Sequence, residues 1–226
     1  MKILVRTESK DNEESIQTWL KKEVQDGENS ILVYPNTQTF RQIYTNYVKD
    51  QLAVRQQEGK ENNNNNNSSR DNNEQSKLRI ILISPFYETV DSVKHQLSAF
   101  GVQNVQGLID SGSLLIVDSF HSFFPDLSGM KKLIDSLSER ARKEGRPGVT
   151  AIVDVGFFFL FGGDSKAADL ISYEASLAPK TQDGNVKGIS CYHWGNYETL
   201  TERDKEMLTQ GQKKKVLEVR EIRNYS

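Results

Sequence analysis

The chain has a single cysteine, almost no net charge and no long apolar run. One cysteine cannot form an internal disulfide, which excludes a cross-linked secreted scaffold. A net charge of -2 over 226 residues gives no overall basic surface for nucleic acid or anionic membranes. No stretch approaches the ~18 uncharged apolar residues of a membrane span, and the first apolar run is too short for a signal peptide. We therefore expect a cytoplasmic protein with no nucleic-acid or membrane partner.

Motifs of catalysis and metal binding are also missing. The chain has neither the P-loop pattern G-x-x-x-x-G-K-[ST] nor G-x-G-x-x-G. Its histidines, His95, His121 and His193, lack metal-ligand spacing. Cys191 lies two residues from His193, but no third group that could orient the imidazole is visible, and a free cysteine is usually a buried apolar residue. We expect no enzyme, no metal and no cofactor, since a nucleotide would lack the loop that holds its phosphates.

What the sequence does contain is an alternation of short apolar runs with longer helical patterns. Near-continuous apolar strands that alternate with helices are typical of a parallel sheet covered on both faces. We predict one α/β domain over residues 1–226, with three layers and a mostly parallel central sheet. The predicted strands are 2–7, 30–35, 78–84, 112–118, 148–155, 185–193 and 214–222, and the predicted helices are 14–24, 40–54, 90–100, 127–142, 166–177 and 197–208.

One segment interrupts this alternation. Residues 56–77, QQEGKENNNNNNSSRDNNEQSK, contain no aromatic or aliphatic side chain. Such a composition cannot bury enough apolar surface to fold, so we expect a disordered Asn-rich insert in one surface loop.

Polar residues close several of the predicted strands. Ligands bind beyond the carboxyl ends of the strands in open parallel sheets, so these residues are candidates for a binding site. Asp118 ends the run LLIVD, the form of an acidic residue that coordinates Mg²⁺ in P-loop ATPases, although the P-loop itself is missing. His121 follows just past the same strand. The strand-end candidates are Thr7, Ser84, Asp118, Ser119, His121, Asp154, Tyr192 and His193.

The run GFFFLFG at 156–162 directly follows a predicted interior strand. Its phenylalanines, Phe157 and Phe159 among them, either pack against a neighbouring helix or subunit, or line an apolar cavity under a lid hinged at glycines. Glu174 falls beside apolar residues of a predicted helix, next to Tyr173. A carboxylate there has either a structural partner or a role in binding.

Several stretches together carry a family resemblance: DGENSILVYP, LSAFGVQNVQGLIDSGSLLIVDS, LISYEASL and VKGISCYHWGNYETL. The chain resembles the MEDS domain, the sensory module shared by methanogen and methylotroph signalling proteins and the dichloromethane-responsive repressor. That family is similar to the RecA/KaiC-like ATPase fold without a working P-loop, which implies the same fold here. The family has a histidine before its last strand, but the stretch MLTQGQKKKVLEV has none. A ligand role that depends on this histidine is therefore not expected here.

The resemblance implies a non-catalytic sensory domain that binds a small molecule at the strand ends and reports to a protein partner carrying the output function. The segment 157–163 is then the candidate moving part. Two alternatives stay open. One is a degenerate RecA/KaiC-like ATP-binding protein that holds phosphates at the turn RTESKDNEES, whose acidic residues would repel them. The other is a structural protein that forms homo-oligomers through GFFFLFG.

Overall fold

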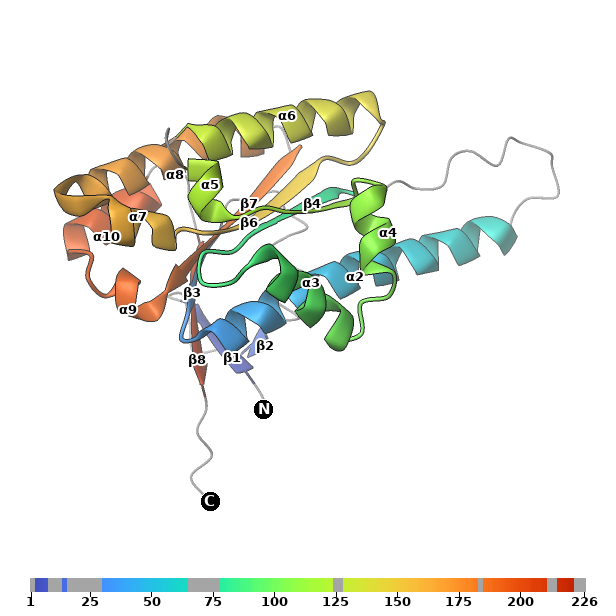
Figure 1. Cartoon of the computed structure of the whole chain (residues 1–226), viewed down its shortest axis with the longest axis horizontal. Helices are drawn as coiled ribbons and strands as arrows, with labels where there is room; N and C mark the ends of the chain where they lie inside the picture. Colours follow the sequence, from blue (N-terminus) through green and yellow to red (C-terminus); the bar gives the residue numbers. More distant parts are fainter. Residues whose placement is uncertain are drawn as a thin grey trace, which may run out of the picture.

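The computed structural model describes residues 3–7, 14–15, 30–64, 78–123, 128–182, 185–210 and 215–221. They form one sheet with helices on both faces (Figure 1). The strand order is β2-β1-β8-β3-β7-β6-β4-β5. The parallel part consists of β8 (Lys215–Glu221), β3 (Ser30–Tyr34), β7 (Val186–His193), β6 (Val149–Asp154), β4 (Ile80–Ser84) and β5 (Leu114–Ile116).

The first strand runs against this direction. β1 (Ile3–Thr7) pairs antiparallel with β8, with Ile3 opposite Glu221 and Thr7 opposite Leu217. β2 (Glu14–Ser15) then pairs antiparallel with β1, where the sequence predicted the start of a helix. Thr7 therefore lies towards the amino ends of the parallel strands, and its prediction as a residue of the carboxyl edge is wrong. Residues 8–13 of the turn proposed to hold phosphates lie outside the described residues.

Two sets of helices cover the sheet. One face carries α2 (Thr37–Asn64), α3 (Val90–Ala99) and α4 (Val105–Asp110). The other face carries α5 (Ser119–Phe123), α6 (Gly129–Lys143), α7 (Gly156–Phe161), α8 (Lys166–Gln182), α9 (Trp194–Tyr197) and α10 (Glu202–Gln210). A short 3-10 turn, Gly163–Ser165, joins α7 to α8. We call these the α2 face and the α8 face.

Each strand contributes to both cores because successive side chains point to opposite faces. In β3, Leu32 and Tyr34 pack on the α2 face, whereas Ile31 and Val33 pack on the α8 face. Every residue of β3, β4 and β6 is buried. This two-sided burial explains why these strands are near-continuous apolar runs in the sequence.

Helix α2 is longer than predicted. It continues to Asn64, so residues 56–64 of the predicted Asn-rich loop are helical, and residues 65–77 of that insert lie outside the described residues. None of the helices in the described part of the chain is long and apolar enough to cross a membrane.

Candidate functional site

The predicted binding residues lie in separate places. Asp154 and His193 end neighbouring strands β6 and β7 on the α2 face. A second group, Tyr173, Glu174 and Tyr192, lies beneath α8 on the opposite face. Asp118 and His121 lie beside β5, the last strand of the sheet. The structure therefore brings together no single site from all the candidates.

Asp154 is the centre of the group at the carboxyl edge, by which we mean the ends of β3, β7, β6 and β4. It is completely buried, and its Oδ2 accepts a hydrogen bond of 2.7 Å from the Tyr34 hydroxyl. Its Oδ1 accepts one of 2.9 Å from the Gly156 amide, the first residue of α7, and the Phe86 amide also donates to the carboxylate. One carboxylate thus ties together β3, β6, the segment after β4 and the start of α7.

The hydrogen bond from Tyr34 to Asp154 joins two strands that are not neighbours in the sheet. β7 lies between β3 and β6, so the bond spans the end of β7. Cys191 of β7 is paired in register with Asp154 and is completely buried on the same face. The prediction that Cys191 is a core residue is confirmed.

Burial dominates the electrostatics of this edge. It raises the pKa of Asp154 from 3.8 to about 7, although the hydrogen bonds from Tyr34, Gly156 and Phe86 act in the opposite direction. Burial also raises the pKa of Tyr34, and the adjacent Asp154 adds to that rise. Asp154 can therefore take up or release a proton close to neutral pH, while Tyr34 stays a neutral hydrogen-bond donor.

Aromatic rings cover the outer side of this group. The His193 ring lies 5.5 Å from the Tyr34 ring and 5.7 Å from the Tyr87 ring. Tyr87 is about half exposed, packs edge-on against Phe86, and its hydroxyl accepts a hydrogen bond of 2.7 Å from Asn196. His193 is half-buried, so a ligand at the carboxyl edge would first meet Tyr87 and His193.

Glu88 follows Tyr87 in the segment between β4 and α3 and faces α2. Its side chain is 3% exposed and forms an ion pair of 2.5 Å with Arg41 of α2. Tyr44 of α2 also donates a hydrogen bond to Glu88 over 3.4 Å. These contacts fix the segment between β4 and α3 against α2, which holds Phe86 and Tyr87 over the strand ends.

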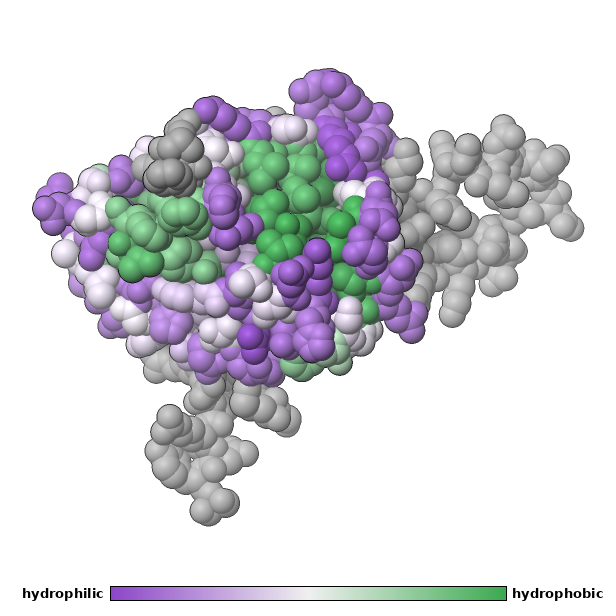
Figure 2. All heavy atoms as spheres, in the orientation of Figure 1, coloured by the Kyte–Doolittle hydropathy of each residue, from purple (hydrophilic) through white to green (hydrophobic). Residues whose placement is uncertain are grey.

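α7 presents apolar side chains beside this edge. Phe157 and Phe158 are buried, whereas Leu160 and Phe161 are 66% and 52% exposed. Figure 2 shows the resulting apolar surface at the end of the molecule where α5 and α7 lie. The Phe161 ring packs against Phe86, with centroids 6.4 Å apart, so this surface adjoins the Asp154 group.

The packing interpretation of the phenylalanine run is confirmed for its first part. Phe157 and Phe158 pack in the core, and Phe159 is half-buried with its ring 6.3 Å from that of Tyr192. Gly156 is not in a left-handed conformation, and a Cβ there would overlap the Phe86 ring. Gly156 is thus required for close packing.

The second group is a polar cluster inside the α8 face. Tyr192 is completely buried and donates a hydrogen bond of 2.8 Å to Glu174, which is itself buried. Tyr192 and His193 were both predicted as strand-end binding residues, but they do not line one site, because adjacent strand residues point to opposite faces. Burial and the Glu174 charge raise the pKa of Tyr192.

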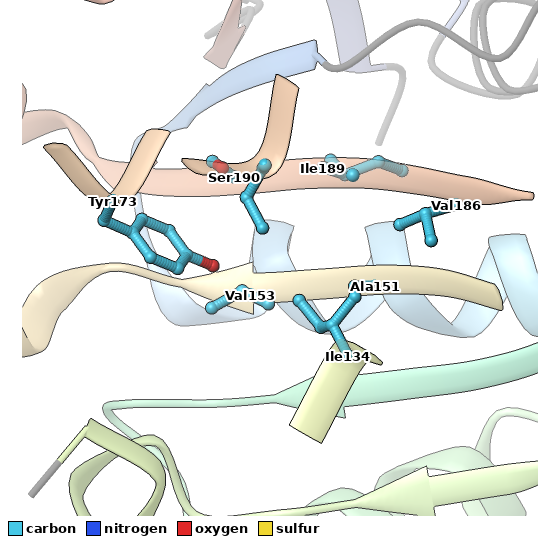
Figure 3. Close-up of a pocket in the computed structure, with 9 residues that line it drawn as sticks. Ile134, Ala151, Val153, Tyr173, Val186, Ile189 and Ser190 are labelled. Atoms are coloured by element: carbon cyan, nitrogen blue, oxygen red, sulfur yellow. The ribbon is translucent and has the colours of Figure 1, made fainter. Parts of the chain in front are cut away.

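Tyr173 adjoins this cluster without joining its hydrogen bonds. Its buried hydroxyl has no hydrogen-bond partner in the described part of the protein. Figure 3 shows the side chain reaching inwards from α8 towards Val153 and Ser190. The gap there is too narrow to hold a water molecule, so the hydroxyl is buried at a cost.

Asp118 and His121 form a local surface pair. Asp118 Oδ1 accepts a hydrogen bond of 2.8 Å from the Phe120 amide, and Oδ2 lies 3.3 Å from His121 Nδ1. The two side chains are 45% and 81% exposed. Asp118 therefore caps the short helix α5, and Asp154 is the acidic residue at the interior of the sheet.

The turn between β3 and α2 begins directly after Tyr34, the residue whose hydroxyl binds Asp154. Its sequence YPNTQT has no glycine and no lysine, and Pro35 has no amide hydrogen. Asn36 Oδ1 accepts a hydrogen bond of 2.9 Å from the Thr39 amide, which occupies one of the first donors of the helix. This turn offers none of the groups by which a P-loop cradles phosphates.

The described residues contain no group of three or more His, Cys, Asp or Glu side chains that could hold a metal ion. Burial raises the pKa of the Cys191 thiol, with Asp154 and Glu174 adding to the rise, so a reactive thiolate is disfavoured. The chemistry available at the carboxyl edge is hydrogen bonding, proton uptake and apolar contact.

Sequence reasoning missed Tyr34, Tyr87 and Glu88. A signal existed for Tyr34, because it ends the buried run SILVY just as Asp154 ends TAIVD. Tyr87 and Glu88 lie in the short segment PFYET after β4, where no periodic pattern marks them.

No family model and no curated protein matches this chain. Among solved structures, it is similar to a KaiC-like protein from the hyperthermophilic archaeon Pyrococcus horikoshii OT3, with a TM-score of 0.50. The sequence identity is 11%, and the likeness covers 88% of this chain and 76% of that chain. The predicted α/β architecture, with helices on both faces of a mostly parallel sheet, is confirmed. The chain therefore has a KaiC-like α/β fold, a conclusion about architecture that assigns no activity.

Proposed function

We propose that this protein is a non-catalytic sensory domain of the MEDS type, which binds a small molecule at the carboxyl edge and relays the binding to a protein partner. The observation that carries this proposal is the Asp154 group. One buried carboxylate joins two strands, the segment after β4 and the start of α7.

A ligand signals only if it prefers one conformation of the protein over another. A small molecule that competes with the Gly156 amide for Asp154 would loosen the attachment of α7 to the sheet. The exposed Leu160 and Phe161 would move with α7. A change at the carboxyl edge would thereby alter an apolar surface available to a partner.

The rings of Tyr87, Phe86 and Phe161 favour a small apolar ligand, halogenated or not, with at most one polar group. A nucleotide is less well supported, because the turn between β3 and α2 lacks the P-loop groups. The exposed pair Leu160 and Phe161 favours homo-oligomer formation as the second candidate function, since such patches mark protein interfaces.

Thermal unfolding of the full chain tests the proposal with small apolar and halogenated compounds, ATP with Mg²⁺, and ADP with Mg²⁺. A compound at a hundred times its Kd should stabilise the folded state by about 2.7 kcal/mol. Phe161→Ser should abolish the response to an apolar compound. Phe100→Ser is the matched control. Phe100 is also exposed, but it caps the end of α3, which runs away from the carboxyl edge.

Stabilisation by nucleotides alone would refute an apolar ligand. An equal response of Phe161→Ser and Phe100→Ser to an apolar compound would refute a binding site at the carboxyl edge. The oligomeric state of the same two variants, measured by sedimentation, distinguishes assembly from ligand sensing. An oligomer that Phe161→Ser dissociates and Phe100→Ser leaves intact, without any response to a ligand, would favour assembly.

A further inference from the structure

A polar pocket lies between α6 and α8, on the outside of the molecule. It has a volume of about 140 Å³. Its lining residues are Ser128, Lys131, Asp169, Ser172, Tyr173 and Ser176. The carboxyl edge contributes none of these residues, so this pocket is distinct from the site of the proposed function.

The sequence positions the lining residues on two helix faces. Asp169, Ser172, Tyr173 and Ser176 follow the spacing i, i+3, i+4 and i+7, which forms one stripe along α8. Ser128 precedes the first residue of α6, and Lys131 lies three positions later. The two helices therefore present hydroxyls, one cation and one carboxylate to a shared space.

The two opposite charges do not neutralise each other. Lys131 forms no ion pair with any residue in the described part of the chain, although Asp169 lines the same pocket. Asp169 accepts a hydrogen bond of 2.7 Å from the Ser165 hydroxyl through Oδ2. Ser176 donates its hydroxyl to the Tyr173 carbonyl over 2.7 Å, which leaves the Ser176 oxygen able to accept. A ligand with both charges would meet a partner for each.

We propose that this pocket binds a small zwitterion, an α-amino acid with a short side chain. Lys131 and the Ser172 hydroxyl would bind the carboxylate, and Asp169 would bind the ammonium group, since charge-assisted hydrogen bonds are the stronger class. The pocket has the volume of about four or five water molecules, at roughly 30 Å³ each, which suits alanine or serine better than tryptophan.

The floor of the pocket connects it to the rest of the protein. Tyr173 is 4% exposed, and its ring contacts Phe123 of α5 at 5.2 Å and Phe158 of α7 at 5.5 Å between centroids. An occupied pocket would therefore rest on the same aromatic packing that holds the buried side of α7.

Isothermal titration of the full chain tests the proposal with L-alanine, L-serine and L-tryptophan, and with acetate and methylammonium as half-ligands that carry one charge each. We expect binding of alanine and serine and no binding of tryptophan or of either half-ligand. Lys131→Gln and Asp169→Asn should each weaken alanine binding roughly tenfold or more, about the factor that one lost charge contact contributes.

Lys132→Gln is the matched control, because it removes the neighbouring positive charge of α6 outside the pocket and should leave alanine binding unchanged. Circular dichroism of each variant confirms that it is folded. Binding of acetate as strong as that of alanine would overturn the zwitterion in favour of a simple anion site. No binding of any amino acid, or equal binding by Lys131→Gln and Lys132→Gln, would overturn the pocket itself.

Discussion

The buried carboxyl of Asp154 should make the stability of the protein depend on pH in a specific direction. Its pKa is 3.8 in an unfolded chain and about 7 in the folded protein, and burial is the main cause. Between these two values the folded state binds more protons than the unfolded state. The contribution of Asp154 to the free energy of unfolding must therefore fall as the pH rises from about 4 to about 7, because stability rises with pH only where the unfolded state binds more protons.

The size of the effect follows from the two pKa values. Each pH unit between them corresponds to about 1.4 kcal/mol, so the rise from 3.8 to about 7 amounts to about 4 kcal/mol. Asp154→Asn removes the charge but keeps the shape. Its amide oxygen can still accept from Gly156, and its NH₂ group can donate to the Tyr34 hydroxyl, which can accept as well as donate.

Urea unfolding at a series of pH values measures this. The stability of Asp154→Asn relative to the natural protein should increase by about 4 kcal/mol between about pH 4 and about pH 8, because only the natural protein has to ionise the buried Asp154 carboxyl. Asp118→Asn is the control for the substitution itself, since the Asp118 side chain is 45% exposed. Parallel pH curves for Asp154→Asn and the natural protein would refute the reasoning.

Two further predictions concern buried groups. Tyr173→Phe should leave the free energy of unfolding unchanged or raise it by about 1–3 kcal/mol, because the lost hydroxyl has no partner among the described residues. Tyr192→Phe should lower it by a similar amount, because Glu174 loses this donor. Urea unfolding distinguishes them, and an equal loss in both variants would contradict the structure. Gly156→Ala should destabilise the protein by about 1–3 kcal/mol, since the new methyl group displaces the Phe86 ring. A neutral result in thermal unfolding would show that the ring moves freely.

The order of strands and helices was predictable because two-sided burial leaves a strong signal. Runs such as SILVY and TAIVD are apolar on both faces and have no other stable place than the interior of a parallel sheet. The direction of β1 was not predictable. Its partner β8 lies at the other end of the chain, and the pairing of Ile3 with Glu221 leaves no local pattern in the sequence.

The site was predicted only in part, for a related reason. Asp118 and Asp154 each follow an apolar run that ends in Ile and Val. Strand order alone separates them, because β6 lies inside the sheet and β5 ends it. The burial that shifts the pKa of Asp154 comes from β3, from the segment after β4 and from α7, whose contacts with Asp154 are set by packing.

The segment GFFFLF resisted a single interpretation because it is apolar at every position. An amphipathic period would have revealed a helix with one buried face, but five apolar side chains in a row have no such period. Only the packing decides that Phe158 is buried and Phe161 is exposed.

The single cysteine gives this protein a natural chemical reporter. Cys191 is completely buried directly beneath the bond from Tyr34 to Asp154, in the middle of the sheet. An alkylating reagent can reach its sulfur only when that end of the sheet opens. Because the chain has no second thiol, the rate of mass gain by the intact protein measures this opening alone. The kinetics of opening, and any ligand that slows it, can thus be followed in the unmodified protein.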